Sequence, residues 1–98
     1  MKHMLMISAL VGLLVGLLPA PSFADACYAD YKAKQDNPLR LHYGVAQLNG
    51  SCDKGSAKSE ISPRLSAAGW TLLNVLAVFG PEGLQQRKAN AGTYYLRF

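Results

Sequence analysis

Apolar and polar residues follow one another along this chain in patterns that predict up to four strands and one helix. The longest apolar run after the N-terminal region is 69–79, where Trp, Val and Phe favour extended structure and both alternating faces are apolar. The two predicted faces are Leu73, Val75, Ala77 and Phe79 on one side, and Leu72, Asn74, Leu76 and Val78 on the other. Because a strand of this kind is normally covered on both sides, we expect 69–79 to be the central strand.

Two segments upstream are predicted to form a hairpin. Residues 27–35 are ambiguous, since their Ala, Lys and Gln residues favour a helix and their tyrosines favour a strand. Residues 36–38 (Asp-Asn-Pro) indicate a turn, and 39–45 alternate as a half-buried strand does. A hairpin folded near Asn37 would bring Cys27 close to Leu48 and therefore near Cys52. This favours a strand over a helix for 27–35.

A short helix is expected before the long apolar run. Ile61, Leu65 and Ala68 share one helical face, Ser59 can cap the helix, and Gly69 stands where helices commonly end. Residues 53–58 are interpreted as a polar linker.

After the break at 80–83, residues 84–90 are expected to hold a turn or two of helix. Residues 93–98 are predicted to be a final strand with Tyr94, Leu96 and Phe98 on one face. The predicted order is (β)β-α-β-β. The fold class is α+β: an antiparallel sheet of three or four strands, with one short helix packed on one face and one disulfide.

The N-terminal region is predicted to be a cleaved signal peptide covering 1–26, which leaves 27–98 as a single small domain. A short polar start, an apolar block over 4–18 and small residues after Pro21 are typical of such peptides. Cleavage before Cys27 and cleavage before Asp25 both fit. The apolar block is short for a permanent anchor, and lipid attachment at Cys27 is the remaining alternative. We therefore expect export to a Gram-negative type of periplasm or secretion, without stable membrane insertion after cleavage.

The two cysteines, Cys27 and Cys52, are expected to form one disulfide in an oxidising compartment. Closing this loop would contribute roughly 3.5 kcal/mol in the chain-entropy treatment. The net charge of +4 is ordinary for a soluble surface. Basic residues near tyrosines are one way to bind single-stranded nucleic acid, but an exported protein seldom meets nucleic acid, and no such partner is expected.

The sequence predicts no catalytic, cofactor or metal site, and we expect a protein that is not an enzyme. His42, Ser51 and Asp53 offer the residue types of a hydrolytic triad, but no nucleophile elbow is present. His42 is therefore interpreted as a surface residue on the polar side of its strand. Cys27, Cys52 and His42 supply fewer ligands than the usual four of a structural zinc site.

The order of elements resembles a family of small bacterial domains of unknown function. The shared feature is a helix that ends in Leu-x-x-x-Gly-Trp before an apolar strand, here 65–70 (Leu-Ser-Ala-Ala-Gly-Trp). The resemblance covers 39–98. This chain departs from it in the signal peptide, the cysteine pair and the polar loop after Phe79. The resemblance supports the expected fold and implies no activity.

The predicted function is that of a non-catalytic binding module of the cell envelope. One short helix cannot cover a four-stranded sheet, so apolar and basic side chains are expected to form an interaction surface. The candidate residues are Leu41, Tyr43, Tyr94, Leu96, Arg87 and Lys88. The partner is an unknown envelope protein or a second copy of the chain. The alternative functions are a small enzyme, a regulatory subunit of an envelope enzyme, or a purely structural envelope component.

Overall fold

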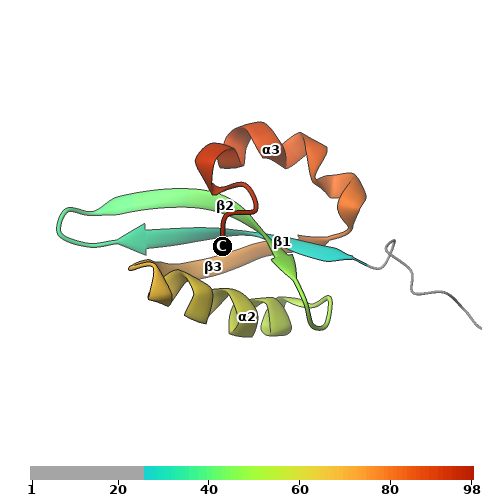
Figure 1. Ribbon diagram of the computed structural model, residues 1–98, viewed down its shortest axis with the longest axis horizontal. Coiled ribbons are helices and arrows are strands. Elements are labelled where there is room, and N and C mark those ends of the chain that lie inside the picture. Colours follow the sequence, from blue (N-terminus) through green and yellow to red (C-terminus); the bar gives the residue numbers. More distant parts are fainter. Residues whose placement is uncertain (1–25) are drawn as a thin grey trace, which may run out of the picture.

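The computed structural model describes residues 26–98 as a three-stranded antiparallel sheet with helices on both faces (Figure 1). Its elements are β1 (Cys27–Gln35), β2 (Arg40–Leu48), α2 (Lys54–Ala67), β3 (Thr71–Phe79), the 3₁₀ turn η2 (Pro81–Gly83), α3 (Gln85–Ala91) and the 3₁₀ turn η3 (Gly92–Tyr94). The predicted signal peptide lies outside the described residues, apart from Ala26. The sheet, its helices and a disulfide confirm the predicted α+β fold class.

β1 and β2 form a regular antiparallel hairpin. Their register runs from Cys27 opposite Leu48 to Gln35 opposite Arg40 without a shift. The turn between them contains a cis Asn37–Pro38 peptide bond, and Asn37 has a φ of 62°, a region that asparagine tolerates better than most residues. The ambiguity over 27–35 is therefore settled as a strand, and the predicted turn is confirmed.

The central strand of the sheet is β1, because the strands lie in the order β2-β1-β3. The prediction that 69–79 forms the centre was wrong. Ala29, Tyr31 and Ala33 of β1 share one face and are completely buried, whereas β3 contains no buried residue. The sequence did not indicate that β1 is central, because its polar residues alternate with the buried ones and lie on the other face of the sheet.

Two β-bulges in β3 determine which of its side chains face the core. The pairing of β3 with β1 shifts register after Asp30 and again after Lys32, and each shift places an extra residue in β3. The residues of β3 that pack against the core are Leu72, Val75 and Val78. The predicted faces, which grouped Val75 with Ala77, were wrong because strict alternation holds only in a strand without insertions.

α2 begins earlier than predicted. Asp53 is its N-cap, and the Asp53 carboxylate accepts a hydrogen bond of 2.8 Å from the backbone N–H of Ser56. Most of the predicted linker over 53–58 is therefore helical, and the predicted cap at Ser59 was wrong. Ile61 and Leu65 are completely buried on the predicted face. The predicted stop at Gly69 is confirmed, since Gly69 has a φ of 83°.

The chain after β3 crosses the other face of the sheet as α3, which confirms the short helix expected over 84–90, and then returns along the outer edge of β2 (Figure 1). The predicted strand over 93–98 was wrong. That segment forms η3 and then a single parallel bridge between Tyr95 and Val45. The backbone N–H of Leu96 donates to the Val45 carbonyl at 2.8 Å. Leu96 itself has a φ of 55°, which ends the alternation.

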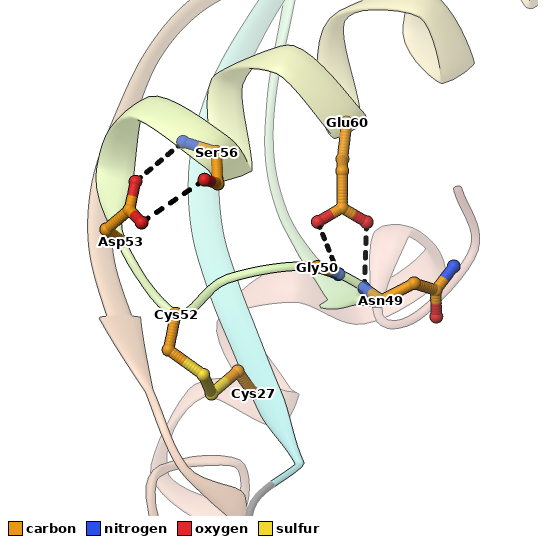
Figure 2. Close-up of a disulfide and its surroundings, with 7 residues drawn as sticks. All are labelled: Cys27, Asn49, Gly50, Cys52, Asp53, Ser56 and Glu60. Carbon is orange, nitrogen blue, oxygen red and sulfur yellow. Dashed lines mark hydrogen bonds between the residues drawn. A yellow bond between two sulfur atoms is a disulfide. The ribbon is translucent and has the colours of Figure 1, made fainter.

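The loop between β2 and α2 is fixed from two sides (Figure 2). The predicted disulfide between Cys27 and Cys52 is present, with Cα atoms 5.8 Å apart. On the other side, the Glu60 carboxylate accepts hydrogen bonds from the backbone N–H groups of Asn49 and Gly50, at 2.7 and 2.9 Å. These amides, with Arg64, hold the pKa of Glu60 below its ordinary value.

Candidate interaction surfaces

The face of the sheet that carries α3 is covered at one end and open at the other. Directly opposed residues of an antiparallel pair share a face, so Leu41, Tyr43 and Val45 of β2 lie on the α3 side together with Lys32 and Lys34 of β1. Val45 is completely buried, while Leu41, four residues earlier on the same strand, is 66% exposed. The hairpin end of this face is therefore open.

A hollow of about 270 Å³ lies at this open end. It is bordered by Lys32, Leu41, Tyr43 and Leu73. Leu73 is an inserted residue at one of the β3 bulges and is 49% exposed. Two exposed leucines, an ammonium group and a phenol therefore lie together on one small mixed surface. We call this set of residues the sheet-face hollow.

A buried carboxylate fixes the covered end of the same face. Asp30 accepts hydrogen bonds from the Tyr43 hydroxyl at 2.8 Å, from the Arg87 Nε at 3.0 Å and from the Ala77 backbone N–H at 2.8 Å. The Arg87 guanidinium also lies 3.9 Å from the ring centre of Phe79. Burial and the hydrogen bond to Asp30 raise the pKa of Tyr43 to about 12. The side chains of Tyr43 and Arg87 are therefore held in place by their hydrogen bonds to Asp30.

His42 is buried among aromatic rings on the α2 side of the sheet, and its interpretation as a surface residue was wrong. Its imidazole is 8% exposed and stacks on Tyr94, with ring centres 3.8 Å apart. Trp70 meets it edge-on at 4.3 Å, and Phe98 lies 5.9 Å away. The alternation of His42 with Leu41 and Tyr43 placed it correctly on the face opposite Leu41. The sequence did not reveal that the C-terminal segment covers that face.

Only one of the two ring nitrogens of His42 has a hydrogen-bond partner among residues 26–98. Its Nε2 shares a hydrogen bond of 3.0 Å with the Tyr31 hydroxyl. Its Nδ1 is buried and has no hydrogen-bond partner among residues 26–98. Burial, followed by the nearby positive charge of Arg97, lowers the pKa of His42. Burial, reinforced by Tyr94, raises the pKa of Tyr31, so this phenol keeps its proton.

The six predicted surface residues do not form one surface. Leu41 and Tyr43 lie together beside the sheet-face hollow. Tyr94 packs on the opposite side with His42, and Leu96, 42% exposed, lies at the outer edge of β2. Of the two basic residues, Arg87 is bonded to Asp30, and Lys88 lies with its ammonium 5.7 Å from the Tyr95 ring centre. Lys32 and Leu73 were not among the six. The position of Leu73 could not be predicted, since a bulge leaves no clear mark in the sequence.

A second hollow, of about 300 Å³, lies where the first turns of α2 pass β3. Leu72, Leu73 and Val75 provide its apolar lining, and Lys54 and Lys58 provide its charge. The two lysines are four residues apart and therefore share one side of the helix. Neither has an ion-pair partner in the part of the chain that the structure describes. We call this hollow, with its five residues, the β3–α2 groove.

A third, wide hollow of about 620 Å³ lies over the loop between β2 and α2 and is lined by glycine, serine and acidic residues. Its two carboxylates are already engaged, as Figure 2 shows: Asp53 caps α2 through Ser56, and Glu60 holds the backbone of Asn49 and Gly50. These carboxylates therefore support the loop.

The residues considered for catalysis do not meet in the structure. The Asp53 carboxylate bonds Ser56, while the one side-chain hydrogen bond of His42 is to Tyr31. Within residues 26–98, no group of three or more His, Cys, Asp or Glu side chains is arranged to hold a metal ion. No helix among those residues is long and apolar enough to span a lipid bilayer.

Comparison with known proteins gave no match: no family model, no curated protein and no solved structure is similar to this chain. The resemblance noted for 39–98 therefore stays a prediction from the residue pattern alone.

Proposed function

We propose that this protein is an exported, non-catalytic binding module that docks a partner protein of the cell envelope on its sheet-face hollow. The observation that carries the proposal is the exposure of Leu41 and Leu73 around one hollow at the open end of the α3 face. Exposed apolar side chains grouped in this way mark interaction sites more often than isolated ones do.

The compartment supports this function. A disulfide indicates an oxidising environment, and the N-terminal pattern favours export to the periplasm or secretion. In such a compartment the partner would be an envelope protein. Lys32 at the border of the hollow favours a partner whose apolar contact is flanked by a carboxylate.

Self-association through this hollow is less favourable. A symmetric contact places the same residues of both copies against each other, which would bring two Lys32 ammonium groups to one interface. We therefore expect a monomer in light scattering at high protein concentration.

The alternative of a small enzyme receives less support from the site. Acid–base catalysis by a histidine normally needs an accessible ring and an orienting group. The ring of His42 is instead enclosed by Tyr94, Trp70 and Phe98, and its hydrogen bond goes to a phenol.

The test is affinity capture from an envelope extract with the oxidised protein and two single variants. Leu41→Lys removes an apolar side chain from the hollow. Leu39→Lys is the matched control, because Leu39 is 64% exposed but lies outside the hollow. A protein captured by the wild type and by Leu39→Lys, but not by Leu41→Lys, would support the proposal. Equal capture by all three, or recovery of the protein alone, would overturn it.

A further inference from the structure

We propose that the free edge of β3 binds an extended, acidic peptide segment of a partner protein, which adds to the sheet as a short fourth strand. The segment would lie along β3 beside the β3–α2 groove. This surface shares Leu73 with the sheet-face hollow but otherwise uses other residues, on β3 and α2. The inference does not rest on the function proposed above, and its test distinguishes the two surfaces.

The two edges of the sheet differ. The outer edge of β2 is occupied by the C-terminal segment, through the Val45–Tyr95 bridge and the Leu96 N–H bond to Val45. Among residues 26–98, β3 pairs with β1 on one side and with no strand on the other. An unpaired edge offers backbone donors and acceptors to any extended chain that can approach it.

β3 also lacks the side chains that usually protect an edge strand. Its nine residues, Thr71–Phe79, include no charged residue and no proline, and seven of them are apolar. The two bulges are the only interruption of its pairing with β1, and they limit how long a regular added strand can be. The edge therefore favours a short segment.

The β3–α2 groove supplies the chemistry that selects the segment. Lys54 and Lys58 border the apolar lining from Leu72 and Val75, and neither lysine has an ion-pair partner within residues 26–98. The nearest carboxylates along the helix are already engaged: Asp53 accepts from the N–H and hydroxyl of Ser56, and Glu60 accepts from two backbone N–H groups and pairs with Arg64. In strand addition, main-chain hydrogen bonds give affinity and alternate side chains give specificity. Here alternate carboxylates would meet the lysines.

A second copy of this chain is a poorer occupant of the same edge. Two β3 strands can pair as antiparallel neighbours, but β3 contains no carboxylate. Such a pairing would leave Lys54 and Lys58 of both copies without partners and would bring four ammonium groups together. An acidic segment of another protein can pair with the backbone of the β3 edge and also place carboxylates beside Lys54 and Lys58.

The test uses the full chain, expressed in a host with an oxidising periplasm and purified in its oxidised form. The probe is a fluorescein-labelled peptide of about eight residues in which Val and Glu alternate, since this places every carboxylate on one side of an extended strand. One control peptide replaces Glu by Lys. A second keeps the glutamates but replaces the central Val residues by Pro, which lowers its capacity to pair as a strand.

We expect the Val–Glu peptide to bind and both controls to bind much more weakly. Its binding should weaken by about tenfold or more in Lys54→Glu/Lys58→Glu. Lys54→Glu places an acidic residue in the first turn of α2, where it favours the helix. Lys58 is exposed, so Lys58→Glu should leave the fold intact. The matched variant is Arg40→Glu/Lys88→Glu, which makes the same charge change away from the groove and should bind as the wild type does.

Backbone NMR shifts identify the binding surface independently of the variants. The largest changes on adding the Val–Glu peptide should fall in β3, over Thr71–Phe79. Changes centred on Leu41 and Tyr43, equal weakening by the two double variants, equal binding of the proline peptide, or no binding at all would each overturn the proposal.

Discussion

The imidazole of His42 stacks on the ring of Tyr94, with ring centres 3.8 Å apart and planes 11° from parallel. This contact joins β2 to the C-terminal segment, whose backbone is otherwise tied to β2 by the Val45–Tyr95 bridge and the Leu96 N–H bond. Aromatic stacking of this kind contributes beyond the area it buries. The end of the chain is therefore held to β2 by the His42 ring as well as by backbone contacts.

The first prediction is that the protein loses stability as pH falls through the range in which histidine titrates. Burial and Arg97 lower the pKa of His42 in the folded state, so the unfolded chain binds more protons than the folded one at mildly acidic pH. The contribution is therefore fully present above the unfolded pKa of about 6.5 and is lost as pH falls toward the folded pKa. Thermal unfolding measured between about pH 8 and pH 5 tests this.

His42→Phe is the control for that measurement. It keeps an aromatic ring against Tyr94 and removes the titration, so its Tm should change less with pH over the same range, whatever its absolute value. The carboxyl of Glu60, whose pKa is also lowered, acts below about pH 4.3 and does not overlap. The same pH slope in both proteins would show that His42 is not the group responsible.

The second prediction concerns Gly44, which lies directly opposite Tyr31. A Cβ at this position would overlap the Tyr31 hydroxyl and ring, so Gly44 gives the phenol the room it occupies next to His42. We expect Gly44→Ala to reduce the free energy of unfolding by about 1–3 kcal/mol. Gly55→Ala is a suitable control, because Gly55 lies in α2 and an added Cβ would meet only the Asp53 carboxylate, at a contact distance of 3.4 Å. This variant should be more stable by about 0.5–1 kcal/mol.

Denaturant unfolding of Gly44→Ala in a Tyr31→Phe background tests whether overlap with the Tyr31 hydroxyl causes the loss of stability. Without the hydroxyl, part of the overlap disappears, and Gly44→Ala should cost less than it does in the wild type. An equal cost in both backgrounds would indicate that the Tyr31 hydroxyl is not what Gly44 accommodates.

The parts of the fold that followed from the sequence were those governed by local pattern. The turn at Asn37, the helix face with Ile61 and Leu65, and the stop at Gly69 depend on neighbouring residues, and all three were predicted correctly. The start of α2 was missed although its signal was present. Asp53 is followed three residues later by Ser56, and the capping bond between them was available to sequence reasoning.

The parts that could not be predicted depend on contacts between distant segments. β1 is central because β3 returns to pair with it and not with β2, which no local pattern states. The bulge at Leu73 moves that side chain beside the sheet-face hollow. His42 is buried because residues 94–98 fold over it. Each of these long-range contacts determines which side chains are exposed at a candidate surface.

The third prediction is that loss of the disulfide weakens the fold by about 3.5 kcal/mol in the chain-entropy treatment. The bond ties the first residue of β1 to the loop before α2 and so restricts the unfolded chain. Cys27→Ser/Cys52→Ser should show this loss in urea, as should the wild type after reduction. Agreement of the two measurements is the control. An unchanged urea midpoint would mean that the Glu60 contacts alone fix the loop.

The last prediction is that Arg87→Met destabilises the protein by about 3 kcal/mol, because it leaves the Asp30 carboxylate buried without its cation. The Tyr43 hydroxyl and the Ala77 N–H would remain but do not carry the compensating charge. Since Asp30→Asn removes the charge itself, the Asp30→Asn/Arg87→Met variant should lose less than the sum of the single losses. Urea unfolding of all four proteins measures this coupling. Additive losses would show that the ion pair does not hold α3 against the sheet.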